Sequence, residues 1–107
     1  MTLVVVVLAG AVGALVRYLV SLIGGVWAVL LVNVVGSFIA GLAIGLSGDL
    51  QLIVATGFCG GLTTFSTFSV NTVELAMKGK WNAAVSAVIA NLVLGVIAAA
   101  AGMTLVR

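Results

Sequence analysis

The sequence predicts an all-α integral membrane protein with four transmembrane helices, the third of which is broken near the middle of the membrane. First, 64% of the residues are hydrophobic and only 6% are charged, which is typical of a membrane protein and not of a soluble domain of this size. Second, the apolar residues fall into four segments with short connections. Third, Gly57–Ser69 brings glycines and hydroxyl groups into the third segment, where a continuous lipid-facing helix would carry Leu and Val.

The four segments have short connections, and nothing between them has the composition of a linker or a second domain. They run over Thr2–Ile23, Gly25–Leu46, Leu50–Met77 and Trp81–Val106. We therefore expect residues 1–107 to form a single transmembrane domain. Four crossings would place both termini on the same side of the membrane.

The third segment is too long for one straight crossing. As a single helix Leu50–Met77 would span about 42 Å, against a hydrocarbon core of about 30 Å. Each glycine lowers helix propensity by about 1 kcal/mol relative to alanine. We therefore expect two half-helices that meet at Gly57–Thr63, the first ending near Phe58. Membrane proteins place ion sites at such breaks. The alternative is a glycine-rich packing face with hydroxyl groups bonded back to the helix.

Polar side chains inside the apolar segments are the candidate functional residues. Asn33 is predicted near mid-membrane, where it either bonds to a neighbouring helix or lines a polar path, and Asn91 also needs a partner. Arg17 either extends to the membrane surface or lines a wet vestibule that attracts anions. Phe65 and Phe68 are i,i+3 neighbours beside hydroxyl groups, and ring edges carry partial positive charge. Together these residues are suited to conducting an anion.

Composition excludes two other classes of function. The chain has no His, one Cys and only two acidic residues, Asp49 and Glu74, which leaves little for acid–base catalysis or metal ligation. We therefore expect that the protein is not an enzyme. A net charge of +2 is too small and too scattered to indicate a nucleic-acid partner.

Three runs carry a resemblance to a known family. Gly57–Ser69 (GFCGGLTTFSTFS) resembles the signature of the Fluc (CrcB) fluoride channels, and Gly10–Tyr18 (GAVGALVRY) and Val32–Gly41 (VNVVGSFIAG) resemble other parts of that family. The resemblance implies a passive, fluoride-selective channel in the cell membrane that exports the toxic anion. It also implies a multi-pass, dual-topology dimer of antiparallel subunits with two pores.

The resemblance assigns roles to individual residues. It implies a structural sodium ion, which is not transported, held by the backbone carbonyls of Gly60 and Thr63. It implies that Arg17 lies near the vestibule. The residues that it places along the anion path are Asn33, Phe65, Ser66, Thr67, Phe68 and Ser69. The chain departs from the family at Asn71, where many members carry glutamate, and in its fourth segment, which has no tyrosine.

Two other functions compete with that of a fluoride channel. A small four-helix multidrug antiporter needs an intramembrane carboxylate, and this chain has none, since Asp49 lies in a loop and Glu74 near a helix end. A scaffold subunit would need no polar break. The bias of Lys and Arg between the two sides is weak, which permits insertion in both orientations. The expected partner is therefore a second copy in an antiparallel homodimer or a paralogous subunit.

Overall fold

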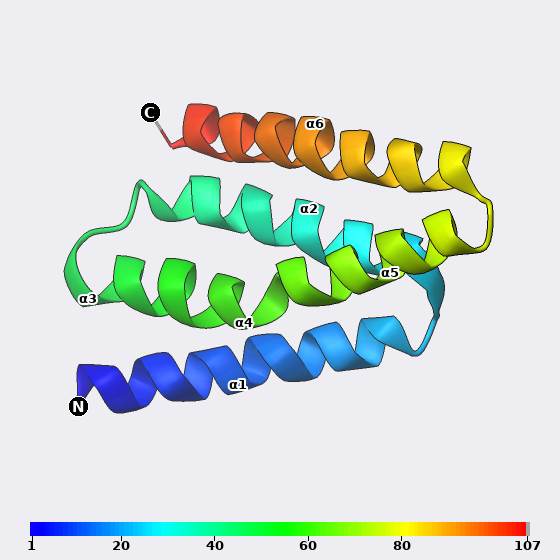
Figure 1. Cartoon of the computed structure of the whole chain (residues 1–107). Helices are drawn as coiled ribbons and strands as arrows, with labels where there is room; N and C mark the ends of the chain where they lie inside the picture. Colours follow the sequence, from blue (N-terminus) through cyan, green and yellow to red (C-terminus); the bar gives the residue numbers. More distant parts are fainter. Residues whose placement is uncertain (107) are drawn as a thin grey trace.

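Figure 1 shows the computed structural model, which describes residues 1–106 apart from the side chains of Gly25, Val26, Phe65, Ser66 and Thr67. Over these residues the chain is helical and contains no strand, as the sequence predicts. The helices are α1 (Thr2–Ser21), α2 (Gly25–Ala43), α3 (Gly48–Gln51), η1 (Leu52–Cys59), α4 (Gly60–Leu62), α5 (Phe65–Met77) and α6 (Trp81–Leu105).

The helices form four long rods that run side by side in a slab of 47 × 29 × 18 Å (Figure 1). The third rod begins with α3, η1 and α4, which follow one another without a gap, and it continues as α5. Its first half packs against α1, and α2 packs most extensively against α6. The first turn of α1 and the last turn of α6 lie at the same end of the slab (Figure 1).

Glycines with a positive φ lie at the connections between the rods. Gly24 (φ 92°) separates α1 from α2, Gly48 (φ 61°) lies at the start of α3, and Gly79 (φ 79°) lies between α5 and α6. These backbone angles are strained for a residue with a Cβ atom. The helices α1 and α2 end a little before the predicted ends of their segments.

The break in the third rod is shorter than predicted and lies later in the chain. The helix does not end near Phe58: it continues through η1 and α4 to Leu62. Only Thr63 and Thr64 are non-helical, with Thr63 in an extended conformation (φ −82°, ψ 152°), and α5 begins at Phe65. We call Thr63–Thr64 the break.

The glycines before the break do not interrupt the third helix. They allow it to pack closely against α1. A Cβ atom on Gly61 would collide with the carbonyl group of Gly10, and one on Gly13 would collide with the carbonyl oxygen of Phe58. The alternative of a glycine-rich packing face is therefore correct for these residues, and it explains why they remain helical. The small faces bring the backbone of α1 against that of η1 and α4.

Helices α2 and α6 also pack closely through glycines. A Cβ atom on Gly41 of α2 would meet the carbonyl of Ala99 in α6, and one on Gly102 of α6 would meet the carbonyl of Phe38 in α2. Both glycines are buried. Each helix therefore places a glycine opposite the backbone of the other, so that α2 and α6 are held in close contact.

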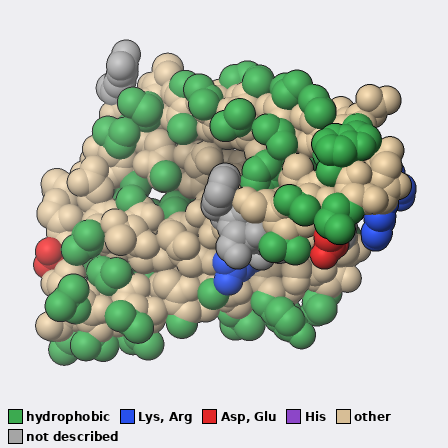
Figure 2. All heavy atoms as spheres, viewed as in Figure 1, with side chains coloured by type: hydrophobic (Ala, Val, Ile, Leu, Met, Phe, Trp, Pro, Cys, Tyr) green, Lys and Arg blue, Asp and Glu red, His purple; other side chains and the backbone are tan. Residues whose placement is uncertain are grey.

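The outside of the slab is apolar, and its buried core is small. Helices α1 and α6 are long and apolar enough to cross a membrane, and Trp27–Ala43 within α2 forms a shorter apolar helix. Hydrophobic side chains spread over the face seen in Figure 2, whereas charged side chains occupy few positions. A buried apolar cluster of Val29, Phe68 and Ala87 joins α2, α5 and α6.

We predict that Gly61→Ala lowers the free energy of unfolding by about 1–3 kcal/mol, as expected for overpacking against a backbone that cannot rotate away. Gly95→Ala is the matched control, because the nearest atom to its added Cβ would be Ser37 Oγ at an ordinary 3.6 Å. In that control the free energy of unfolding should rise by about 0.5–1 kcal/mol, because alanine loses less backbone entropy on folding than glycine does. Equilibrium unfolding in mixed detergent micelles measures both, and equal effects of the two substitutions would contradict the proposed helix contact.

Candidate functional site

The break takes its hydrogen bonds from a neighbouring helix. The backbone N–H and the hydroxyl of Thr63 both donate to the carbonyl of Cys59, each at 2.9 Å, and so complete the preceding helix. The N–H of Thr64 donates instead to Asn33 Oδ1 in α2 at 2.9 Å. Asn33 Nδ2 donates in return to the carbonyl of Thr64 at 3.3 Å. A single carboxamide therefore pairs with both backbone groups of Thr64.

A second carboxamide extends this arrangement to α6. Asn33 Nδ2 also donates to Asn91 Oδ1 at 3.0 Å, and Asn91 Nδ2 donates to the carbonyl of Ala87 in its own helix at 3.0 Å. Both asparagines are half-buried. The network therefore joins the break to α2 and α6 in a part of the molecule where unpaired polar groups would be costly.

A pocket of about 230 Å³ opens beside the break, and we call it the Arg17 pocket. Arg17 of α1 is half-buried and lines it, and Thr64 lines it from the break. Its remaining lining residues are Tyr18 and Ser21 of α1 and Ala28, Val29 and Val32 of α2. The pocket therefore combines a fixed positive charge and hydroxyl groups with an apolar wall, a combination that favours a small anion.

The chain matches one known family over most of its length. Residues 4–103 match the family model described as CrcB-like protein, Camphor Resistance (CrcB). The chain belongs to the CrcB family. Because the match covers nearly all of the sequence, the family membership applies to the whole four-rod domain.

Relatives in the CrcB family carry a common name. A protein of Yersinia pseudotuberculosis named fluoride-specific ion channel FluC 1 is 41% identical, over 84% of this chain and 81% of its own. Proteins named fluoride-specific ion channel FluC from Methylobacterium radiotolerans and Pyrococcus abyssi are 39% and 37% identical, over 94% and 99% of this chain and 81% and 96% of their own. These names describe membrane channels, which agrees with the expectation that this CrcB protein is not an enzyme.

The remaining predicted site residues of this CrcB chain lie after the break. The side chain of Phe68 is buried against Val29 and Ala87, so within one subunit its ring belongs to the apolar core. Ser69 is half-buried. The side chains of Phe65, Ser66 and Thr67 lie outside the described residues, and their predicted roles stay predictions.

The two residues predicted to hold sodium lie near the C-terminal end of the helix that precedes the break. Gly60 is exposed, and the space around its Cα is open, since an added Cβ would find no atom within 4 Å. Thr63 is half-buried. Carbonyl groups in the last turn of a helix lack partners in that helix and lie at the negative end of its dipole. The donor set fits a cation bound by backbone oxygens, and the described residues contain no cluster of acidic, His or Cys side chains that could replace them.

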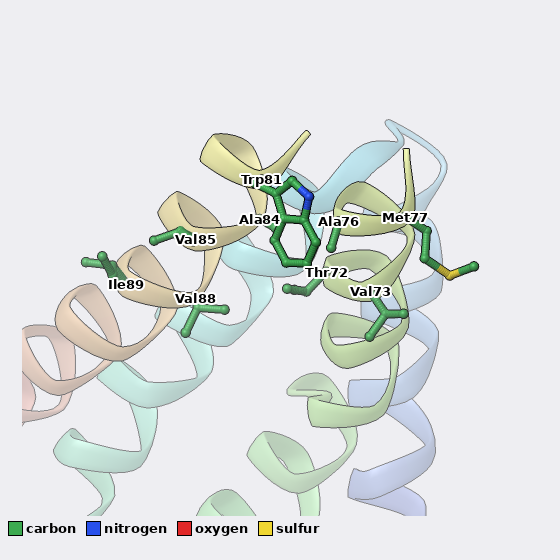
Figure 3. Close-up of a pocket in the computed structure, with 9 residues that line it drawn as sticks. All are labelled: Thr72, Val73, Ala76, Met77, Trp81, Ala84, Val85, Val88 and Ile89. Atoms are coloured by element: carbon green, nitrogen blue, oxygen red, sulfur yellow. The ribbon is translucent and has the colours of Figure 1, made fainter. Parts of the chain in front are cut away.

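A larger pocket, of about 560 Å³, lies between α5 and α6 and differs in chemistry (Figure 3). Apolar side chains such as Val73, Val85 and Trp81 line it, and its one hydroxyl group, on Thr72, donates to the carbonyl of Phe68. Nothing in this lining would replace the hydration shell of an ion. The pocket is therefore not a candidate anion site.

The pairing of Asn33 with the break was not predicted from the sequence. The sequence indicated that Asn33 lies near the broken segment and either bonds to a neighbouring helix or lines a polar path, and that Asn91 needs a partner inside the bilayer. They are far apart in the chain, and their common partner is a backbone group with no side-chain signal of its own. The useful signal was one amide in each of two apolar helices beside a broken third one.

Proposed function

We propose that this protein is a fluoride-selective channel that lets toxic fluoride leave the cell passively across the cell membrane. The observation that carries the proposal is the Arg17 pocket, where a half-buried guanidinium and hydroxyl groups meet the polar break. The names of the relatives support fluoride as the transported ion. The residues of this chain themselves support the binding of an anion in the Arg17 pocket.

Fluoride crosses a membrane only where other donors replace its strongly bound water. Arg17 offers charged N–H donors within reach of an anion in the pocket. The hydroxyl of Ser21 donates to the carbonyl of Tyr18 in this structure and would have to turn toward the anion. The apolar wall formed by Val29 and Val32 lowers the local dielectric constant and so strengthens the attraction between the guanidinium and an anion. The pocket is open to the outside, so an anion that enters can also leave.

We propose that the anion path continues along α5. There the hydroxyl groups of Ser66, Thr67 and Ser69 would replace further water, and the ring edges of Phe65 and Phe68 would add partial positive charge. Phe68 lies on the side of α5 that contacts α2 and α6, where it is buried within one subunit, so the proposed path requires its ring edge to become accessible in the assembled channel. Asn33 contributes by holding Thr64 at the inner end of the Arg17 pocket.

We propose that the four rods cross the membrane and that two chains assemble as an antiparallel dimer with two pores. The first half of the third rod supports this, because it presents Thr56 and Gly60 at the surface of the isolated chain and Thr63 beside them. Carbonyl groups in the last turn before the break lack partners in that helix, and each such group left unsatisfied in lipid costs several kcal/mol. We call Thr56, Gly60 and Thr63 the strip. A second copy, or a paralogous subunit, would cover it.

The same strip is the proposed site of a structural sodium ion. Carbonyl oxygens of Gly60 and Thr63 from two chains would hold it, and the ion would supply fixed positive charge without being transported. This role fits the open space at Gly60 and the helix end beside it. Here the residues of the chain supply only neutral oxygens, so the bound ion would keep its full charge and favour anions in the neighbouring pores.

We predict that the protein reconstituted in liposomes releases trapped fluoride and retains chloride, and that Arg17→Gln slows fluoride release by about tenfold or more, since a hydrogen bond to a charged group contributes about 1.5–3 kcal/mol. Lys80→Gln is the matched control, because it removes the same charge from an exposed turn. A fluoride electrode follows release. Absence of fluoride release by the wild type, or equal release by both variants, would contradict the proposed function or the role of the pocket.

We predict that replacing sodium on both sides by a large organic cation lowers fluoride release and shifts the protein from dimer to monomer, because the oxygens of the strip would lose their shared ligand. Light scattering in detergent gives the mass, and the liposome assay gives the flux. Restoring sodium should reverse both effects. A dimer that forms and conducts equally well without sodium would exclude the ion from this role.

A further inference from the structure

Asn91 in α6 has no part in the pocket, and yet its position decides how the break is held. Its Nδ2 donates to the carbonyl of Ala87, one turn earlier in α6, at 3.0 Å. This bond uses the donor end of the carboxamide within its own helix. The acceptor end, Oδ1, is therefore directed toward α2, where it accepts from Asn33 Nδ2 at 3.0 Å.

The carboxamide of Asn33 can be satisfied in one orientation only. Its Oδ1 accepts from the N–H of Thr64, and its Nδ2 donates to both Thr64 O and Asn91 Oδ1. If the amide were flipped, Nδ2 would face the N–H of Thr64, and Oδ1 would face Asn91 Oδ1. Two donors and two acceptors would then oppose each other at once. Asn91 therefore reinforces the orientation that the two backbone groups of Thr64 require, and it ties Asn33 to α6.

The same bonds define what Asn33 can do. A carboxamide nitrogen carries two hydrogens, and here two acceptors, Thr64 O and Asn91 Oδ1, lie within hydrogen-bond distance of it. Asn33 is also not among the residues that line the Arg17 pocket, whereas Thr64 is. Within one subunit, Asn33 acts on the pocket by fixing the Thr64 peptide group.

We propose that Asn91 is a positioning residue, which acts through Asn33 to hold the Thr64 peptide group at the inner end of the Arg17 pocket. Its part in fluoride passage rests on the proposed function, but the holding of the break does not. Without the acceptor of Asn91, the carboxamide of Asn33 keeps only its two bonds to Thr64, one of them as long as 3.3 Å, and loses its link to α6. The backbone of Thr64 is then held by a partner that is itself less firmly fixed.

The test compares Asn91→Leu with Thr104→Val, a control that removes another polar side chain of α6, whose hydroxyl bonds to Ala100 of its own helix. Nuclear magnetic resonance of isotope-labelled protein in nanodiscs follows the side-chain NH₂ of Asn33 and the exchange of the Thr64 amide proton. Fluoride release is measured on the same samples. These spectroscopic signals separate positioning from a general loss of helix packing.

In Asn91→Leu we expect one Asn33 NH₂ proton to move to the position of a free amide, faster exchange at Thr64, unchanged exchange in α1, and slower fluoride release. The control should leave all four unchanged. In an Asn33→Leu background, Asn91→Leu should have no further effect on release, because the pair acts as a unit. Unchanged Asn33 and Thr64 signals, or additive effects on release, would overturn the proposal.

The wild-type protein provides a test that does not depend on the folding of a variant. Both NH₂ protons of Asn33 should resonate as hydrogen-bonded protons, and one should show a nuclear Overhauser contact to Asn91. A spectrum in which one proton is free would overturn the proposal. If these signals are as expected but the wild type releases no fluoride, the proposed function fails and the positioning role of Asn91 stands.

Discussion

The pairing of the Asn33 carboxamide with the backbone of Thr64 is the interaction on which the rest of this structure depends. A peptide group that leaves a helix inside an apolar molecule costs about 1–3 kcal/mol for each polar group left unsatisfied. Thr64 avoids this cost because a side chain of α2 supplies both an acceptor and a donor. The third rod can therefore change its path at the break without leaving either backbone group of Thr64 unpaired. The Asn33 carboxamide and the Thr64 backbone form a polar site inside the otherwise apolar slab.

The glycine contacts serve this pairing by setting the distances between helices. Gly13 lets α1 approach the carbonyl of Phe58, which brings Arg17, one turn later, beside the break. Gly41 and Gly102 hold α2 against α6, which keeps Asn33 within reach of Asn91. The positive charge and the polar backbone of the pocket thus come from different rods, held in register by contacts in which a side chain on any of these glycines would collide with backbone.

Much of the helical architecture could be predicted from the sequence, because four apolar segments and short turns permit few arrangements. The position of the break could not. Glycine has a low helix propensity, which placed the expected break at Gly57–Thr63, but close contact with α1 keeps Gly57 and Gly61 in a helix. Arg17 could be recognised because a charge in an apolar segment is conspicuous. The partnership of Asn33 with Thr64 could not be predicted, because it depends on the packing of distant segments and on a backbone group.

The most direct test of a fluoride site at the break is a titration of the labelled wild-type protein in nanodiscs with fluoride, at constant ionic strength, with chloride as the reference anion. Nuclear magnetic resonance would follow the Arg17 Nε–H group, the Thr64 amide and the amide of Thr104, which lies near the far end of α6. We expect fluoride, and not chloride, to shift the signals of Arg17 and Thr64 in a saturable manner while Thr104 stays unchanged. Shifts of the same size with chloride, or fluoride shifts that spare both Arg17 and Thr64, would contradict a fluoride site at the break.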